Sequence, residues 1–186
     1  MNSSELIGEL IEMTKNHISR TEKFLECDDV TLNKITQNQW TILECCEHLN
    51  QYFNFYLPEI SKKLSFSKST SKVNFSPGLI GDYFAKSMLP KVNMTKMKSP
   101  KDKNPVGISL NKSVIEDLIK HLETLLSLLE QSKSVNLEKV KIKISISKLI
   151  QLKLGDTFRF IINHNERHIV QAEKLFHPIK FPNQYD

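Results

Sequence analysis

Two histidines near the end of the chain have a spacing that suits metal binding. His164 and His168, in the stretch FIINHNERHIVQAEKL (160–175), are four residues apart. On an α-helix such residues lie one above the other on the same face, so both imidazoles can reach one ion. A metalloprotease of the H-E-x-x-H type needs its glutamate directly after the first histidine, where this chain has Asn165. Glu166 is rotated by about 200° from His164, so we do not expect a protease.

A third histidine completes a candidate ligand set. Ligands in helical bundles come from facing helices and project into the core. His48, in the stretch WTILECCEHLNQYF (40–53), lies about two turns inside a predicted helix. The same face of that helix also carries Glu44, Cys45 and Tyr52. Three histidines plus a water are the ligand set of an open catalytic metal site. Cys45 is either a fourth ligand, a reactive thiol or a buried small side chain.

Apolar spacing predicts four long helices that would carry these residues. They are expected over 3–26, 40–64, 110–131 and 148–176. In the second helix, Thr41 and Glu44 have the spacing of a capping box, which makes Thr41 the expected N-cap. Trp40 is placed as half of a hydrophobic staple, and Pro58 is expected to bend the helix or end it early.

Other stretches are assigned by their pattern. The alternating VKIKISIS (140–147) resembles a strand, but a single strand without partners is unstable. We therefore interpret it as an extended linker into a helix that is capped near Ser145 or Ser147. Residues 27–39 are predicted to be a loop, and 79–89 a short helical piece within the long segment 65–108. His17 and His121 lack strong claims as ligands, and His17 is expected at the surface.

Together the elements predict an all-α fold: a four-helix bundle in a single domain, 1–186. Short connections make helices one and two antiparallel, and likewise three and four. The connection between helices two and three, about 44 residues over 65–108, is long enough to return the full length of a helix of roughly 36 Å. Those two helices can therefore run parallel, which gives an up-down-down-up arrangement with a long crossover.

Composition narrows the function classes. The chain has 186 residues, 39 % apolar and 25 % charged, with only 5 glycines and 7 prolines, as expected for a helical globular protein. No apolar run approaches the roughly 18 residues of a membrane span, and no secretory signal is visible. The 3 cysteines do not suggest a disulfide framework, so we expect a cytoplasmic protein. The net charge is +5, but the lysines over 91–103 are not interleaved with aromatic residues, so we expect no nucleic-acid partner.

The two histidine stretches resemble the DinB/YfiT-like family. WTILECCEHL is similar to that family's Trp-Ser/Thr-x-x-Glu-x-x-x-His-Leu segment, and HNERHIVQAEKL to its His-x-x-x-His-x-x-Gln segment. Both occur in the expected order, and the resemblance spans most of the chain. It implies a divalent ion, zinc or nickel in the first place, held by His48, His164 and His168 near one end of the bundle. Family members include thiol S-transferases and thiol-dependent isomerases, and several form homodimers.

The resemblance implies a metal-dependent enzyme that activates water or a low-molecular-weight thiol, as an S-transferase or a hydrolase. Glu44 is the candidate acid or base, although the capping box alone would account for it. Arg167 and Gln171 are candidates for substrate binding, although a surface ion pair and ordinary helix packing are their alternatives. The other interpretation of the whole chain is a non-catalytic, metal-stabilised bundle that acts as a dimeric binding or stress-response module.

Overall fold

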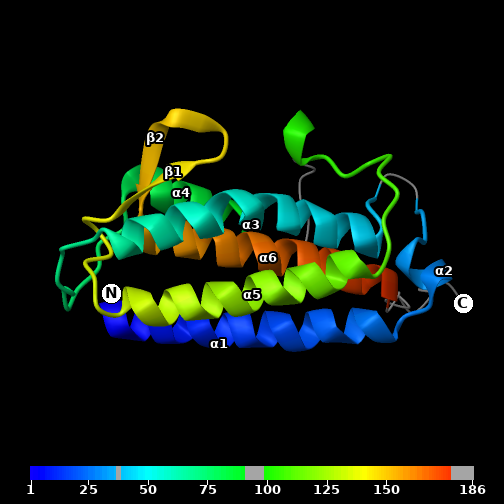
Figure 1. Cartoon of the computed structure of the whole chain (residues 1–186), viewed down its shortest axis with the longest axis horizontal. Helices are drawn as coiled ribbons and strands as arrows, with labels where there is room; N and C mark the ends of the chain where they lie inside the picture. The colour runs from blue at the N-terminus through cyan, green and yellow to red at the C-terminus, as the bar shows by residue number, and fades with distance from the viewer. Residues whose placement is uncertain (37–38, 91–98, 177–186) are drawn as a thin grey trace, which may run out of the picture.

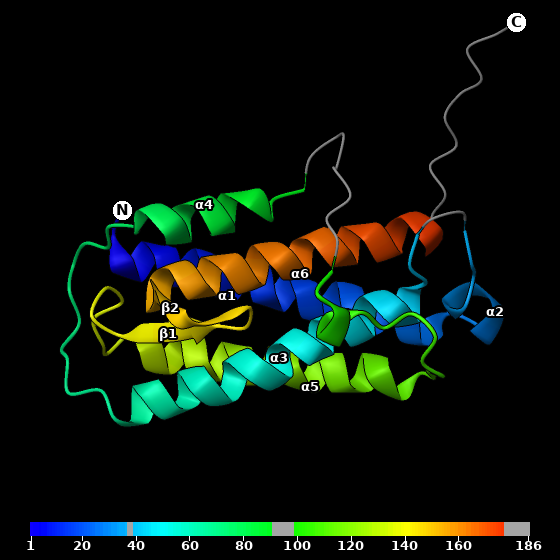
Figure 2. The same cartoon turned by 90° about the horizontal axis from the view of Figure 1, so that it is seen from above.

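The chain is mostly helical, with one small two-stranded sheet. The computed structural model describes residues 1–36, 39–90 and 99–176. Four long helices lie lengthwise beside one another (Figures 1 and 2): α1 (Ser3–Glu22), α3 (Ile42–Ser65), α5 (Ser113–Ser132) and α6 (Leu154–Phe176). The shorter elements are η1 (Lys23–Glu26), α2 (Asp29–Leu32), α4 (Leu79–Ser87), η2 (Lys101–Lys103) and the strands β1 (Lys141–Ile144) and β2 (Ser147–Lys153).

The long helices are held together by one apolar core. Helices α1 and α3 each pack against both α5 and α6. Each long helix presents a stripe of buried side chains to its neighbours, as amphipathic helices do. The stripe of α5 includes four fully buried leucines: Leu118, Leu122, Leu125 and Leu129. Among the described residues, no helix is long and apolar enough to cross a membrane.

Helix α3 begins at the predicted cap. The Thr41 hydroxyl accepts a hydrogen bond from the Glu44 N–H at 3.1 Å, and the Glu44 carboxylate accepts one from the Thr41 N–H at 2.8 Å. This reciprocal pair is a complete capping box. Pro58 lies inside the helix and does not end it, because α3 continues to Ser65. Its ring is on the exposed side of the helix, where the carbonyl left without a partner can be hydrated.

The interpretation of 140–147 as a linker is wrong. Strand β1 pairs with β2 in an antiparallel hairpin, with Ile142 opposite Leu152. The second strand supplies the partner that a lone strand lacks. Both side chains of that pair are buried, so the hairpin contributes to the core. Helix α6 therefore begins at Leu154, several residues later than predicted.

The long segment between α3 and α5 contains the predicted short helix, α4, which lies alongside α6 (Figure 2). The buried Asp156 carboxylate accepts a hydrogen bond from the Gly78 N–H at 2.8 Å. Arg159 donates to Asp82 at 2.8 Å and to Asp156 at 3.2 Å. These bonds attach α4 to the first turns of α6. In the segment 27–39, predicted as a loop, the single-turn helix α2 is present.

Candidate metal centre

The three predicted histidines meet between α3 and α6. His48 lies two turns into α3, and His164 and His168 lie on the same face of α6. One ring nitrogen from each comes within 4.8 Å of the other two. All three side chains are buried, with exposed fractions of 3 %, 5 % and 8 %. The fold therefore brings together the two histidines found from their spacing and His48, which was found from its place on a facing helix and from the family resemblance.

Outward hydrogen bonds fix the orientation of two of the imidazoles. His48 Nδ1 lies 2.7 Å from the Lys103 carbonyl, which only accepts, so Nδ1 carries the proton. His168 Nδ1 lies 3.1 Å from the Gln171 side-chain oxygen, which likewise accepts. With the single proton of each neutral ring on Nδ1, the Nε2 lone pairs are free. This is the arrangement that metal-binding histidines have, with the second ring nitrogen bonded to an acceptor.

The distances between the ring nitrogens suit an ion. His48 Nε2 and His164 Nε2 are 3.2 Å apart. Nitrogen ligands at about 2.0–2.1 Å from a tetrahedral ion are about 3.3–3.4 Å from each other. The same pair can be bridged by a proton only if it comes from His164, because the His48 proton is on Nδ1. The donor set and its spacing therefore fit a divalent ion with three histidine ligands.

Burial keeps the imidazoles in the form that binds metal. It lowers the pKa of His48 to about 4 and that of His168 to about 3. The pKa of His164 is also lowered, first by burial and then by the charges of its neighbours. Metal ligation needs the neutral ring. At neutral pH no proton has to leave these side chains before an ion enters.

Aromatic rings enclose the imidazoles. Trp40 lies 4.6 Å from His48 between ring centroids and stacks on His168 at 5.6 Å. Phe160 stacks on His164 at 5.8 Å, with an angle of 5° between the rings. Tyr52 lies 4.5 Å from His164 and 5.0 Å from His48. Such packing locks the ring orientations and lowers the local dielectric. From the sequence, Trp40 was predicted only as half of a hydrophobic staple, and Phe160 was not predicted to belong to the site.

The turn η2 also belongs to the site, which sequence reasoning missed. Its last residue, Lys103, supplies the carbonyl that orients His48. The Ser99 hydroxyl donates to the same carbonyl at 2.9 Å. The positive charge of Lys103 further lowers the pKa of His48. Every residue has a main-chain carbonyl, so the role of the Lys103 carbonyl could not be predicted from residue types or motifs.

The remaining candidates lie around the three histidines. One Glu44 oxygen accepts the capping-box hydrogen bond from the Thr41 N–H, which is the structural role predicted as the alternative to an acid or base. Gln171 is bonded to His168, so it orients a candidate ligand. The charge of Arg167 helps to lower the pKa of both His164 and His168. Their roles toward a substrate stay predictions.

Cys45 is buried but does not join the histidines. Its exposed fraction is 1 %, and burial raises the pKa of its thiol well above the ordinary value. Within the described part of the chain, the cluster of possible ligand atoms contains the three imidazoles and not this sulfur. A buried, protonated thiol behaves as a small apolar side chain. Among the described residues, the geometry therefore leaves the fourth position of the site without a protein ligand.

Glu166 faces away from the histidines, as the helical geometry predicted. It accepts a hydrogen bond from His17 Nε2 at 2.9 Å and from Arg20 at 2.6 Å. Arg20 also donates twice to Glu173, both times at 2.7 Å. The expectation that His17 lies at the surface is wrong, because its exposed fraction is 1 %. Its partner is 149 residues away in sequence, so local spacing gave no sign of the contact.

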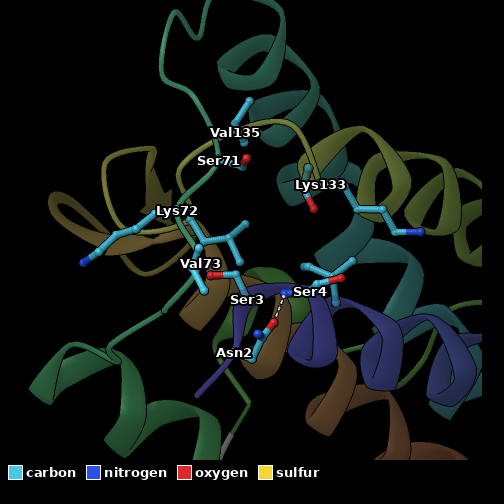
Figure 3. A pocket seen from close by; sticks show the side chains of 11 residues that line it. Asn2, Ser3, Ser4, Ser71, Lys72, Val73, Lys133 and Val135 are labelled. Atoms are coloured by element: carbon cyan, nitrogen blue, oxygen red, sulfur yellow. Dashed lines mark hydrogen bonds between the residues drawn. The ribbon is translucent and has the colours of Figure 1, made fainter.

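A pocket of about 320 Å³ lies elsewhere, near the N-terminus of α1 (Figure 3). It is about 20 Å along α1 from the level of His17 and Glu166, at a rise of 1.5 Å per residue. Figure 3 shows Lys72 and Lys133 extending away from the pocket, and they pair with Glu138 and Glu130. The pocket offers hydroxyl groups and apolar walls, and we assign no function to it.

Comparisons of the chain with protein-family models, with curated proteins and with solved structures find no match. The geometry of the three histidines and the two sequence stretches that contain them are the features that point to a function.

Proposed function

We propose that the chain is a DinB-like protein in which His48, His164 and His168 hold a divalent ion, zinc or nickel. The proposed fold is the up-down-down-up four-helix bundle, with a long crossover between α3 and α5. The packing of α1 and α3 against both α5 and α6 supports this arrangement. So does the run of colour along the long helices in Figure 1, where α1 and α6 run opposite to α3 and α5.

One observation carries the metal assignment. Two imidazoles give their Nδ1 protons to outward acceptors, and the ring nitrogens of His48 and His164 meet at a distance that an ion requires. Without an ion, His48 and His168 would turn unprotonated nitrogens toward a common buried point. A single proton from His164 would pair with His48, whereas a divalent ion can accept a lone pair from each of the three imidazoles, so an ion suits the arrangement best.

A divalent ion bound there supplies Lewis acidity, which brings the pKa of a bound water or thiol toward neutrality. The chain's own residues would do the rest. Arg167 provides a positive charge beside the site for an anionic substrate group. Gln171 and the Lys103 carbonyl hold two imidazoles in place, and the aromatic rings exclude water. We propose an S-transferase or hydrolase that uses water or a low-molecular-weight thiol.

The first experiment is metal analysis of untagged protein by mass spectrometry, beside the double variant His48→Ala/His164→Ala. We expect a near-stoichiometric ion that the double variant lacks. His121→Ala is the matched control, because His121 is a partly buried histidine that contacts Asn50 instead of the three histidines. An ion that remains in the double variant would show that these residues do not hold it.

The non-catalytic alternative differs from the enzyme in what occupies the fourth coordination position of the ion. A metal-stabilised module needs no exchangeable ligand, whereas the enzyme needs one. The separation of Cys45 from the cluster favours the open site. Thiol-transfer and hydrolysis assays on the loaded protein then separate the two proposals, because a purely structural ion gives stability without turnover.

A further inference from the structure

The phenol of Tyr52 lies beside the histidines. Tyr52 lies one turn after His48 on α3, and side chains on a helix lean toward its N-terminus. Its ring contacts two of the three imidazoles, His164 at 4.5 Å and His48 at 5.0 Å. Tyr52 is partly exposed, whereas the imidazoles are buried. Its side chain is therefore in contact with both the imidazoles and the solvent.

The Tyr52 hydroxyl is available to a ligand. Among the described residues it has no hydrogen-bond partner, whereas the next tyrosine on this face, Tyr56, accepts a hydrogen bond from the Ser145 N–H at 3.2 Å. The other rings around the imidazoles offer less. Phe160 has no polar atom, and Trp40 stacks on His168, so that its N–H, which lies in the ring plane, does not point at that imidazole.

We propose that the Tyr52 hydroxyl donates a hydrogen bond to an anionic group, a thiolate or an oxyanion, that enters the histidine site. This inference rests on the proposed function and adds a substrate-binding residue to it. A phenol is protonated at neutral pH, so it can donate to an anion there. Lys103 and Arg167 lower the pKa of the histidines beside them, and their positive charges favour an anion in the same place. Asp102, 3.6 Å from the Lys103 ammonium, offsets part of that charge.

The test compares two small probes on cobalt-loaded protein by visible absorption. Azide is an anion that can accept the Tyr52 hydrogen bond while it occupies the site. 1-Methylimidazole is neutral, and once its unsubstituted nitrogen is bound it has neither an N–H to donate nor a free lone pair to accept a hydrogen bond. We expect Tyr52→Phe to weaken azide binding by about tenfold or more, as for the loss of a hydrogen bond to a charged group. Binding of 1-methylimidazole and metal content should not change.

Tyr56→Phe is the matched control, because it removes the same atom from the same face of α3 one turn further on. It should leave azide binding unchanged. Equal azide affinity in wild-type and Tyr52→Phe protein would overturn the inference and leave the proposed function standing. So would an equal loss for both probes, a loss of cobalt from Tyr52→Phe, or an equal azide loss in Tyr56→Phe. Failure of wild-type protein to bind azide would overturn it as well, and failure to bind cobalt, zinc or nickel would overturn both proposals.

Discussion

The contact between α4 and α6 makes a sharp prediction about one glycine. A Cβ atom added at Gly81 would lie 2.5 Å from Asp156 Cβ and 2.6 Å from its Cγ. Asp156 cannot move aside easily, because it is fully buried and bonded to the Gly78 N–H and to Arg159. Gly81→Ala must therefore displace either α4 or a buried carboxylate.

The size of the effect follows from these contacts. Overpacking of a tight site costs about 1–3 kcal/mol. Displacement of Asp156 also weakens the charged hydrogen bond from Gly78, which is worth about 1.5–3 kcal/mol. The higher helix propensity of alanine returns about 1 kcal/mol. We expect a net loss of about 2–3 kcal/mol, which for a chain of this size lowers Tm by about 4–12 °C.

Thermal unfolding followed by circular dichroism measures this change. The matched control is Gly8→Ala in α1, where an added Cβ has no atom within 4 Å. That variant should raise Tm by about 2–4 °C, since it gains helix propensity without a clash. The reasoning would be refuted if Gly81→Ala were as stable as wild-type or as stabilised as Gly8→Ala.

Two further predictions concern the other helices. Glu166→Gln should cost about 1–2 kcal/mol by weakening the bonds from His17 and Arg20, while metal content stays at the wild-type value. Loss of the ion in that variant would contradict the orientation of Glu166 away from the site. Pro58→Ala should raise the free energy of unfolding by about 1–2 kcal/mol, because it restores a helix hydrogen bond inside α3. An unchanged or lower urea midpoint would show that the proline is not a local weakness.

Local patterns predicted some elements well. The Thr41–Glu44 spacing predicted the start of α3, and the apolar spacing over 110–131 predicted α5, because both signals act within a few residues. The hairpin was missed because its turn has no glycine or proline to mark it. The residues of the second strand were therefore assigned to the helix that follows. The contact of Gly81 with Asp156 joins residues far apart in sequence, which periodicity does not reveal.

In the candidate site too, local sequence signals found some residues, whereas contacts between distant segments could not be predicted. His164 and His168 were found from their spacing, and His48 from its place on a facing helix and the family resemblance. The Lys103 carbonyl could not be found, because every residue has one. His17 was placed at the surface because its polar partner, Glu166, lies on a distant helix. Side-chain type and spacing thus indicated the candidate ligands, whereas the groups that orient them depended on the fold.

The most direct test of the central claim is the number of metal ions bound per chain, measured on untagged wild-type protein and on His48→Ala/His164→Ala. The account predicts about one zinc or nickel ion per chain in the wild-type protein and none in the double variant. Wild-type protein that binds no ion, even after reconstitution with zinc, nickel and manganese, would contradict it.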